Sequence, residues 1–218
     1  MKITEKIEIT NEDNMELMAR YPDKYFDLAI VDPPYGIGFS DYERGSSGIK
    51  VKKRYTKNGK KDWDNETPSK KYFDELKRVS KNQIIWGGNY FSQLWVNGCK
   101  GFIFWFKHQP VDNFAKGELA YTSFNKPAQC FDYMYYGNIN RDVVQLHPTQ
   151  KPVALYKWLL DKYSKEGDKI LDTHLGSGSI AIACHDYGFE LTACELDTEY
   201  YEKAVERIKN HTNQLKLF

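Results

Sequence analysis

The stretch D-P-P-Y (32–35) places a carboxylate and an aromatic ring around two prolines, directly after the apolar run F-D-L-A-I-V (26–31). Proline fixes its φ angle at about −65° and has no backbone N–H, so Pro33 and Pro34 present carbonyl oxygens and no donors. The Asp32 carboxylate also accepts hydrogen bonds, and Tyr35 adds an aromatic face. These groups suit a planar ring that bears an amino group. The alternative is a stiff turn in which Asp32 only caps the backbone.

A second group of residues, L-D-T-H-L-G-S-G-S (171–179), lies between a predicted strand and a predicted helix. Glycines at such a junction let the backbone approach a ligand closely and leave helix N–H groups free. Glu195 ends the next predicted strand, where an acid accepts hydrogen bonds from a ribose in nucleotide-binding α/β sites. The alternative is an ordinary turn with a surface glutamate.

The elements around these motifs alternate between strands and helices. Apolar runs and alternation predict strands at 3–9, 26–31, 82–86, 101–106, 129–136, 169–172 and 189–195. Helical spacing and helix-start residues predict helices at 14–20, at 68–79, from Pro152, at 181–185 and at 198–210. This order predicts an α/β fold, with a mostly parallel twisted sheet and helices on both faces. A length of 218 residues suits a single domain, 1–218.

The charge is balanced overall but uneven along the chain. The net charge is +1, yet residues 44–81 carry 13 Lys and Arg against 5 Asp and Glu. The polar stretch 36–65 is long for a connection, so we expect a mobile loop with a function of its own. Local positive charge attracts phosphates. The alternative is a solvated loop.

The four cysteines, Cys99, Cys130, Cys184 and Cys194, have no C-x-x-C spacing and no accompanying histidine cluster. This pattern argues against a zinc site and against a disulfide scaffold. Reduced thiols, a polar N-terminus without a signal peptide, and the lack of an apolar run of about 18 residues predict a cytoplasmic protein.

The motifs together resemble those of the S-adenosylmethionine-dependent DNA amino-methyltransferases. D-P-P-Y resembles their catalytic motif, and L-G-S-G-S (175–179) their methionine-binding loop. C-E-L-D-T-E-Y-Y-E-K-A-V-E-R-I (194–208) is similar to their ribose-binding strand and helix, and H-P-T-Q-K-P (147–152) to a further cofactor-binding segment. The order, with the catalytic motif before the glycine loop, resembles the beta group and implies a Rossmann-like class I methyltransferase fold. Asp instead of Ser in the catalytic motif suggests N6 of adenine over N4 of cytosine.

The resemblance implies a role for each motif residue. The catalytic residues it implies are Asp32, Pro33, Pro34 and Tyr35. The residues it implies for binding S-adenosylmethionine, which becomes S-adenosylhomocysteine, are Asp13, Asp32, His147, Thr149, Lys151, Pro152, Asp172, Thr173, Gly176, Ser177, Gly178, Ser179, Glu195 and Leu196. Asp13 resembles the acid near the cofactor's adenine. Tyr121, in E-L-A-Y-T-S-F (118–124), resembles a residue of the target-base pocket. No metal is implied.

DNA is the partner that the resemblance implies. The predicted contacts to its phosphates are Lys50, Lys52, Lys53, Arg54, Lys57, Lys60 and Lys61 in the basic loop. The family's target-recognition region corresponds to only 107–146 here. The short region predicts simple specificity or a second subunit, and a homodimer is plausible by resemblance. A partner endonuclease of a restriction-modification system is not evident in the chain. D-T-H-L (172–175) departs from the family's usual D-P-F, and we expect His174 to have no catalytic role.

The mechanism implied is direct transfer onto a flipped-out adenine. Hydrogen bonds from its amino group to Asp32 and to the Pro33 carbonyl would localise the nitrogen lone pair, while Tyr35 stacks on the ring. Four alternatives stay open: methylation of cytosine N4, methylation of RNA adenine, a small-molecule methyltransferase, and a non-catalytic nucleic-acid-binding subunit. Methylation of protein glutamine is disfavoured, because those enzymes have Asn where this chain has Asp32.

Overall fold

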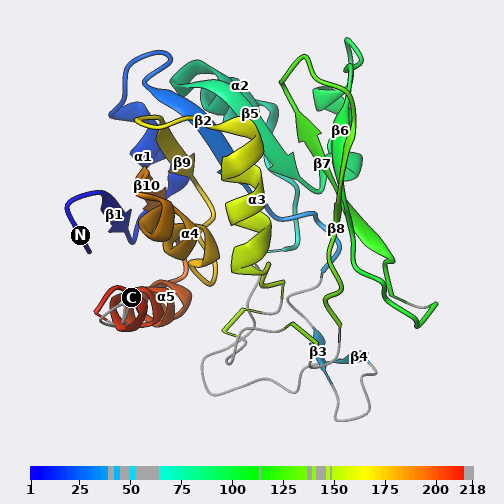
Figure 1. The fold of residues 1–218 in the computed structure, drawn as a ribbon. Helices are drawn as coiled ribbons and strands as arrows, with labels where there is room; N and C mark the ends of the chain where they lie inside the picture. Colours follow the sequence, from blue (N-terminus) through cyan, green and yellow to red (C-terminus); the bar gives the residue numbers. More distant parts are fainter. Residues whose placement is uncertain are drawn as a thin grey trace.

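The computed structural model describes residues 1–38, 42–44, 50–52, 64–112, 114–136, 139–140, 146–147 and 149–213. An eight-stranded sheet crosses the molecule in the order β1-β10-β9-β2-β5-β7-β6-β8 (Figure 1). Its strands are β1 (Ile7–Thr10), β2 (Phe26–Val31), β5 (Ser80–Trp86), β6 (Phe102–Phe106), β7 (Gly117–Thr122), β8 (Gln129–Asp132), β9 (Lys169–Asp172) and β10 (Glu190–Cys194). The short strands β3 (Tyr42–Arg44) and β4 (Lys50–Lys52) pair separately.

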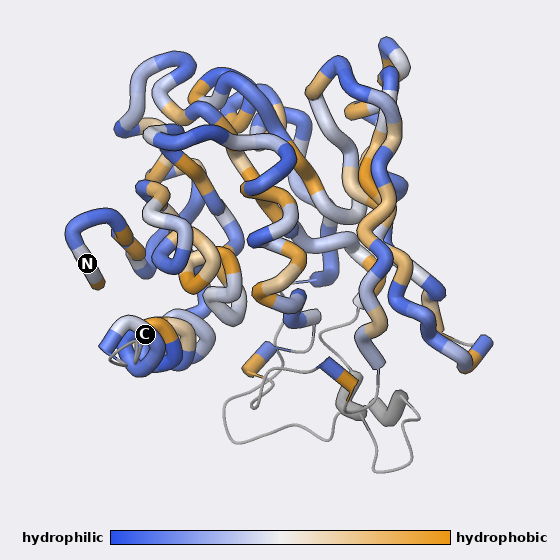
Figure 2. Tube along the Cα trace, in the orientation of Figure 1, coloured by the Kyte–Doolittle hydropathy of each residue, from blue (hydrophilic) through white to orange (hydrophobic). Residues whose placement is uncertain are grey.

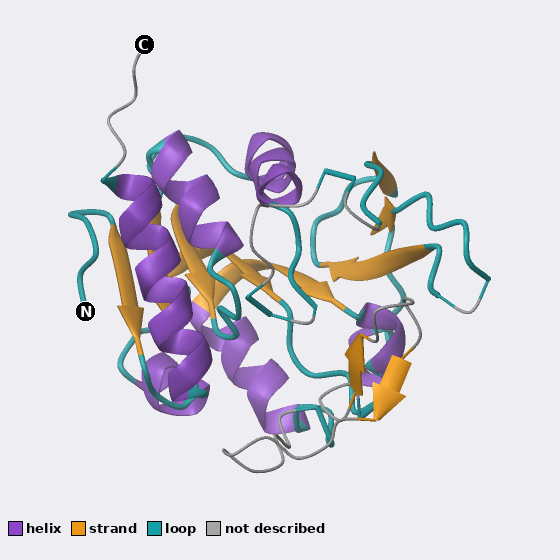
Figure 3. Cartoon of the chain, turned by 90° about the horizontal axis from the view of Figure 1, so that it is seen from below, coloured by secondary structure: helices purple, strands orange, loops and turns teal. Residues whose placement is uncertain are grey.

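The described helices are α1 (Asn14–Ala19), α2 (Lys70–Val79), α3 (Val153–Tyr163), α4 (Ser179–Tyr187) and α5 (Thr198–Thr212), with 3-10 turns η2 (Gly88–Tyr90) and η3 (Ser92–Leu94). Helices lie on both sides of the strands when the molecule is seen from below (Figure 3). No helix among the described residues is long and apolar enough to span a membrane.

The sheet is mostly parallel, as the sequence predicts. Strands β1, β10, β9, β2 and β5 pair in parallel, and β6 and β8 run in the same direction as they do. Strand β7 alone among these runs the opposite way, between β5 and β6. The α/β fold with helices on both faces is therefore confirmed, and β7 is a strand that the sequence analysis missed.

Two apolar layers form because strand side chains alternate between the faces of the sheet. In β2, Leu28 and Ile30 pack with α3, α4 and α5, whereas Ala29 and Val31 pack with α1 and α2. All four side chains are fully buried, as expected for a continuous apolar run covered on both sides. Figure 2 shows the same pattern, with hydrophobic residues concentrated in the strands and in the helices that cover them.

The central strands β9 and β2 are neighbours from which the chain winds in opposite directions. From β9 it passes through α4 to β10, and from β2 it passes through α2 to β5. In open α/β sheets such a switch point leaves a crevice at the carboxyl ends of the strands. Both chemical motifs begin there, because Asp172 ends β9 and Asp32 follows β2 directly.

Some predicted boundaries are wrong. The first strand begins at Ile7 rather than at residue 3, because Thr4 turns the chain and its hydroxyl accepts the backbone N–H groups of Lys6 and Ile7. The strand predicted at 129–136 ends at Asp132. Of the predicted loop 36–65, only parts belong to the described residues, and the same is true of 107–146.

Candidate active site

The Asp32 carboxylate lies at the carboxyl edge of the sheet, the edge at which the parallel strands end. The Tyr35 hydroxyl donates a hydrogen bond to Oδ1 over 2.5 Å, and the Lys151 ammonium donates to Oδ2. Burial raises the pKa of Asp32, and Lys151 opposes that rise. D-P-P-Y and H-P-T-Q-K-P, far apart in the sequence, therefore meet in one ion pair.

The Tyr35 ring is packed from several sides. It stacks on Tyr90, with ring centroids 4.9 Å apart and planes inclined by 12°. Gly87 has a φ of 69°, and a Cβ there would lie 2.1 Å from Tyr35 Cε1. Glycine at position 87 therefore provides both the left-handed backbone and the room for the ring. Tyr90 is 44% exposed, so the stacked pair reaches the surface.

Asp64 fixes the backbone that follows the prolines. Its carboxylate accepts the N–H groups of Tyr35 and Gly36 over 2.7 and 3.1 Å, and its carbonyl accepts the N–H of Gly38. Only 2% of Asp64 is exposed. Asp64 thus joins the beginning of the polar stretch 36–65 to its end, close to Asp32. Asp64 was not among the predicted site residues, since it lies in a polar stretch with no periodic pattern.

Lys151 is surrounded by groups that stabilise its charge. Its Nζ lies 3.2 Å from Glu118 Oε2, besides binding Asp32. The ring centroid of Trp86 is 5.4 Å away and that of Tyr35 is 6.0 Å away. Burial would lower the pKa of Lys151, but the carboxylates of Asp32 and Glu118 raise it. Lys151 is therefore a cation although its side chain is only 2% exposed.

The glycine loop and Glu195 meet as the sequence spacing predicts. The N–H of Gly176 donates to Glu195 Oε2 over 2.8 Å, and the N–H of Asp197 donates to Oε1 over 3.0 Å. Gly176 has a φ of 55°, which favours glycine. Burial raises the pKa of Glu195, and these backbone N–H groups oppose the rise. Each oxygen keeps a lone pair, so the carboxylate can still accept hydrogen bonds from a ligand.

Gly178, Ser177 and Ser179 hold the loop against α5. Gly178 precedes α4 with a φ of 77°, and a Cβ there would lie 2.8 Å from Ile208 Cδ1. Arg207 donates to the Ser177 carbonyl and to the Ser179 hydroxyl. Both serines are buried. Arg207 therefore ties the start of α4 to α5.

Asp172 and Thr173 continue β9 into a buried polar cluster. The N–H of His174 donates to Asp172 Oδ1 over 3.0 Å. Burial raises the pKa of Asp172 to about 8. The Thr173 hydroxyl lies 2.7 Å from the Tyr72 hydroxyl and 2.9 Å from His174 Nδ1. The cluster ties the glycine loop to α2.

His174 replaces the aromatic residue that resembling enzymes usually have. Its Nε2 lies 3.2 Å from Asn14 Nδ2, an amide nitrogen that can only donate. The ring proton is therefore on Nδ1, facing Thr173. Burial lowers the pKa of His174 to about 3, so the ring is neutral. His174 links the loop to the start of α1.

H-P-T-Q-K-P lies opposite the glycine loop. The ring of His147 is the nearest group to the open side of Gly176, 3.7 Å from the position of a Cβ there. Its Nδ1 accepts hydrogen bonds from the N–H and hydroxyl of Thr149, and its ring packs against Tyr200 of α5. Pro152 precedes α3 as its cap residue. The predicted cofactor segments therefore face one another.

Asp13 and Leu196 lie in two segments that the chain brings together next to Glu195. Asp13 caps α1, accepting the N–H of Met15 over 2.7 Å. Leu196 follows Glu195 and is 69% exposed. Asn11 joins the two segments, because its amide donates to the carbonyls of Glu195 and Leu196. An acid and an exposed apolar side chain are thus grouped beside Glu195.

The residues predicted to contact DNA are described only in part. Tyr121 lies in β7, paired with Ile85, and its ring meets Trp95 edge-on at 5.3 Å. Lys50 and Lys52 bound β4, whereas Lys53, Arg54, Lys57, Lys60 and Lys61 lie outside the described residues.

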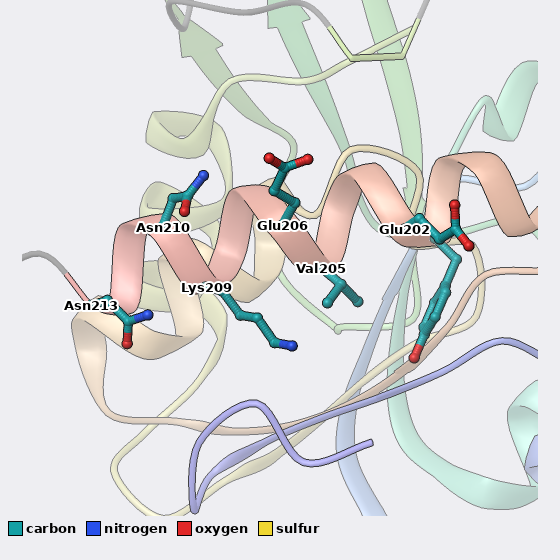
Figure 4. A pocket seen from close by; sticks show the side chains of 7 residues that line it. Glu202, Val205, Glu206, Lys209, Asn210 and Asn213 are labelled. Atoms are coloured by element: carbon teal, nitrogen blue, oxygen red, sulfur yellow. The ribbon is translucent and has the colours of Figure 1, made fainter.

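A hollow on the outer side of α5 has no part in this arrangement. Its lining includes Glu202, Val205, Glu206, Lys209 and Asn210 (Figure 4). None of the predicted catalytic or binding residues lines it.

Comparison with known proteins finds methyltransferases among the relatives of this chain. The chain is 37% identical to the type II methyltransferase M.HpaI of Haemophilus parainfluenzae over 83 residues, 38% of this chain and 26% of that enzyme. It is 23% identical to the type II methyltransferase M2.DpnII of Streptococcus pneumoniae, over 95% of this chain and 92% of the other.

The fold is also that of a solved structure. The M1.HpyAVI–SAM complex superposes with a TM-score of 0.59 at 19% identity, covering 92% of this chain and 98% of the other. The model of the N6_N4_Mtase family, described as DNA methylase, matches residues 55–206. The chain therefore belongs to this family of DNA methylases, whose name spans N6 and N4 methyltransferases.

Proposed function

We propose that the protein transfers a methyl group from S-adenosylmethionine to the exocyclic N6 of adenine in DNA. The observation that carries this proposal is the position of Asp32. Its carboxylate lies at the carboxyl end of β2, beside the strand that leads into the glycine loop. An acceptor for an amino group and a nucleotide-type loop are thereby adjacent at a switch point of the sheet.

The residues of the loop fit S-adenosylmethionine. Among the described residues no cation pairs with Asp172 or Glu195, and burial raises the pKa of both carboxyls. A cationic ligand would lower these pKa values again, because an opposite charge favours the ionised form of a carboxyl. Glu195 would accept the ribose hydroxyls, and Gly176 leaves space above the loop. When bound, the cofactor supplies an electrophilic methyl group on a sulfonium.

The protein's contribution to the chemistry is to hold acceptors and exclude water. Asp32 would accept one N–H of the amino group, and the Pro33 carbonyl the other. No donor from the described residues bonds to that carbonyl. Both acceptors are fixed before the base arrives, since Lys151, Tyr35 and Asp64 hold the segment. Fixed acceptors that face developing positive charge on nitrogen stabilise the transition state.

The choice of adenine, the catalytic roles and DNA contact by the basic loop are parts of this proposal. Asp32, where a Ser in the motif would suggest N4 of cytosine, supports adenine as the target base. A base inside a duplex must be flipped out, which costs a few kcal/mol. The lysines and Arg54 of 50–61 would contact phosphates, and Tyr121 would line the base pocket. A second copy of the chain or a separate subunit would complete the grip on a duplex.

The test is product analysis. The purified protein is incubated with unmethylated DNA and isotope-labelled S-adenosylmethionine, the DNA is digested to nucleosides, and the labelled nucleoside is identified. Asp32→Ala is the variant, and Asp74→Ala, which removes an exposed carboxylate paired with Lys70, is the matched control. We expect labelled N6-methyladenine with the wild type and the control, and none with Asp32→Ala.

Other outcomes correct the proposal in specific ways. Labelled N4-methylcytosine would keep the role of Asp32 and change the base, which the family name allows. Label in RNA only would change the polymer. Full activity of Asp32→Ala would overturn the role of the carboxylate. Binding of S-adenosylmethionine without transfer to either polymer would favour a non-catalytic subunit.

A further inference from the structure

Four charged side chains of alternating sign form a continuous row across the carboxyl edge of the sheet. Lys107 binds Glu118 Oε1, Glu118 Oε2 lies 3.2 Å from Lys151 Nζ, and Lys151 binds Asp32. Two positive and two negative charges give the row a net charge of zero. The motifs account for Asp32 and Lys151 at one end. They assign no role to Lys107, and in the segment 118–124, which begins at Glu118, they assign a role to Tyr121 only.

The antiparallel strand β7 is what brings Glu118 to this edge. Parallel strands have their last residues here, but β7 runs the other way and has its first residues here. Glu118 is the second residue of β7 and pairs with Trp105, and Lys107 follows β6 directly. The row therefore joins the inserted strand to the catalytic motif.

Lys151 would be unfavourable in a methyl-transfer site without a counter-charge. Its side chain is only 2% exposed, and its ammonium binds Asp32 in a site that, in the proposed reaction, must accept a sulfonium and then positive charge on the target nitrogen. Like charges repel strongly when they are shielded from water. One negative charge, that of Asp32, cannot both neutralise Lys151 and favour these cations.

We propose that Glu118, held by Lys107, is a positioning residue that cancels the charge of Lys151, so that the site favours the cationic S-adenosylmethionine over its neutral-sulfur product. This inference rests on the proposed function. It gives the row a role in product release, because loss of the sulfonium charge on methyl transfer weakens binding of the spent cofactor.

The protonation state of Glu118 supports the inference. Burial alone would raise its pKa, but Lys107 and Lys151 outweigh burial and lower the pKa to about 2. Glu118 is therefore ionised at every pH at which the protein would work. Its charge is permanent, unlike that of a carboxyl that titrates near neutrality.

A purely structural role for Glu118 makes a different prediction. Breaking a buried ion pair destabilises a protein, and a distorted site would bind both forms of the cofactor less well. An electrostatic role acts on the sulfonium charge alone. The ratio of the dissociation constants of S-adenosylhomocysteine and S-adenosylmethionine separates the two roles, because the ligands differ by one methyl group and one charge.

The experiment measures both dissociation constants by isothermal titration calorimetry on the purified full chain. For Glu118→Gln, we expect the preference for S-adenosylmethionine to fall about tenfold, the scale of one unit charge acting over about 10 Å at an effective dielectric constant of about 20. Lys107→Gln makes the row negative and should raise the preference. Glu118→Gln/Lys107→Gln restores neutrality and should return the ratio to that of the wild type.

Glu190→Gln is the matched control, since it removes an exposed carboxylate at the opposite end of a strand. Equal weakening of both ligands in Glu118→Gln, or an unchanged ratio in Lys107→Gln, would overturn the inference and leave the proposed function intact. If Glu118→Gln does not fold, Lys107→Gln alone decides. A wild-type protein that binds neither ligand would overturn the proposed function, and this inference with it.

Discussion

The two halves of the candidate site treat charge differently. In the target half, around Asp32, each charged side chain pairs with one of opposite sign. Lys151 pairs with both Asp32 and Glu118. In the cofactor half, the carboxylates of Asp172 and Glu195 are held by backbone N–H groups, and no ion pair to them occurs among the described residues. One half is neutralised by its ion pairs, whereas in the part of the chain that the structure describes no ion pair neutralises the two carboxyls of the other half.

This difference matches the two ligands in the proposed reaction. A base is neutral before it reacts, so the target half needs no net charge to attract it. S-adenosylmethionine carries a sulfonium and an ammonium, so uncompensated carboxylates attract it. Backbone N–H groups suit the second task because they orient a carboxylate without cancelling its charge. The comparison can be tested by altering each half in turn.

Removing the cation of the target half should have the largest effect. Lys151→Met leaves the carboxylates of Asp32 and Glu118, which are 16% and 23% exposed, without their shared partner. Breaking a buried pair in this way costs about 3–5 kcal/mol of unfolding free energy, which urea denaturation would measure. Lys203→Met is the matched control, since Lys203 lies on α5 in a surface pair with Glu199, and surface pairs contribute about 0–1 kcal/mol. Equal losses in the two variants would show that the row is not an energetic unit.

The cofactor half should respond to pH through Asp172. Its folded-state pKa, about 8, lies above the unfolded value. The folded protein thus holds a proton that the unfolded chain releases, and stability should fall as pH rises from about 4 to about 8. A bound cation favours the ionised carboxyl, so the affinity for S-adenosylmethionine should rise by up to about tenfold per pH unit towards pH 8.

Asp172→Asn should remove this pH dependence, because the amide does not titrate. Isothermal titration calorimetry at pH 6, 7 and 8 would measure it for both proteins, and thermal melts at the same pH values would follow the stability. A wild-type affinity that does not change over this range would show that Asp172 keeps one protonation state on binding.

The contrast between the halves also explains how much of the site the sequence could predict. The cofactor half was predictable, because Gly176 and Glu195 lie at the ends of consecutive strands of a parallel β–α–β unit, where spacing along the chain fixes spacing in the fold. Their hydrogen bond confirms that geometry. The strands and helices around them were also predicted, with errors mainly at their ends.

The target half was less predictable, because it is assembled by an antiparallel insertion and by a returning loop. Glu118 reaches the site only because β7 runs against its neighbours. Asp64 reaches it only because the chain returns to D-P-P-Y after the basic stretch. Neither contact follows from a local pattern, since pairing partners across a sheet are not encoded by the periodicity of one segment.

Two glycines offer a matched test of packing in the halves. Gly87→Ala adds a Cβ that would clash with the Tyr35 ring, at a φ of 69°, so we expect a loss of about 3 kcal/mol. Gly176→Ala meets nothing closer than 3.7 Å, at a φ of 55°, so only the backbone term of about 1 kcal/mol applies. Urea denaturation of the two variants would measure both. Similar losses would mean that Tyr35 shifts freely, and that its packing does not position Asp32.

The smallest effect should come from His174→Phe, which restores the aromatic residue of resembling enzymes. The variant loses hydrogen bonds to Asn14 and Thr173 but keeps an aromatic ring against Tyr72. A neutral hydrogen bond contributes about 1 kcal/mol, so we expect a modest loss of affinity for S-adenosylmethionine by calorimetry. Because the pKa of His174 is lowered to about 3, the ring stays neutral from pH 6 to 9, and the pH profile of methyl transfer should be unchanged. A changed pH profile with unchanged affinity would instead show that His174 takes part in the reaction. The buried polar cluster that His174 forms with Thr173 and Tyr72 would then act in the chemistry and not only support the glycine loop.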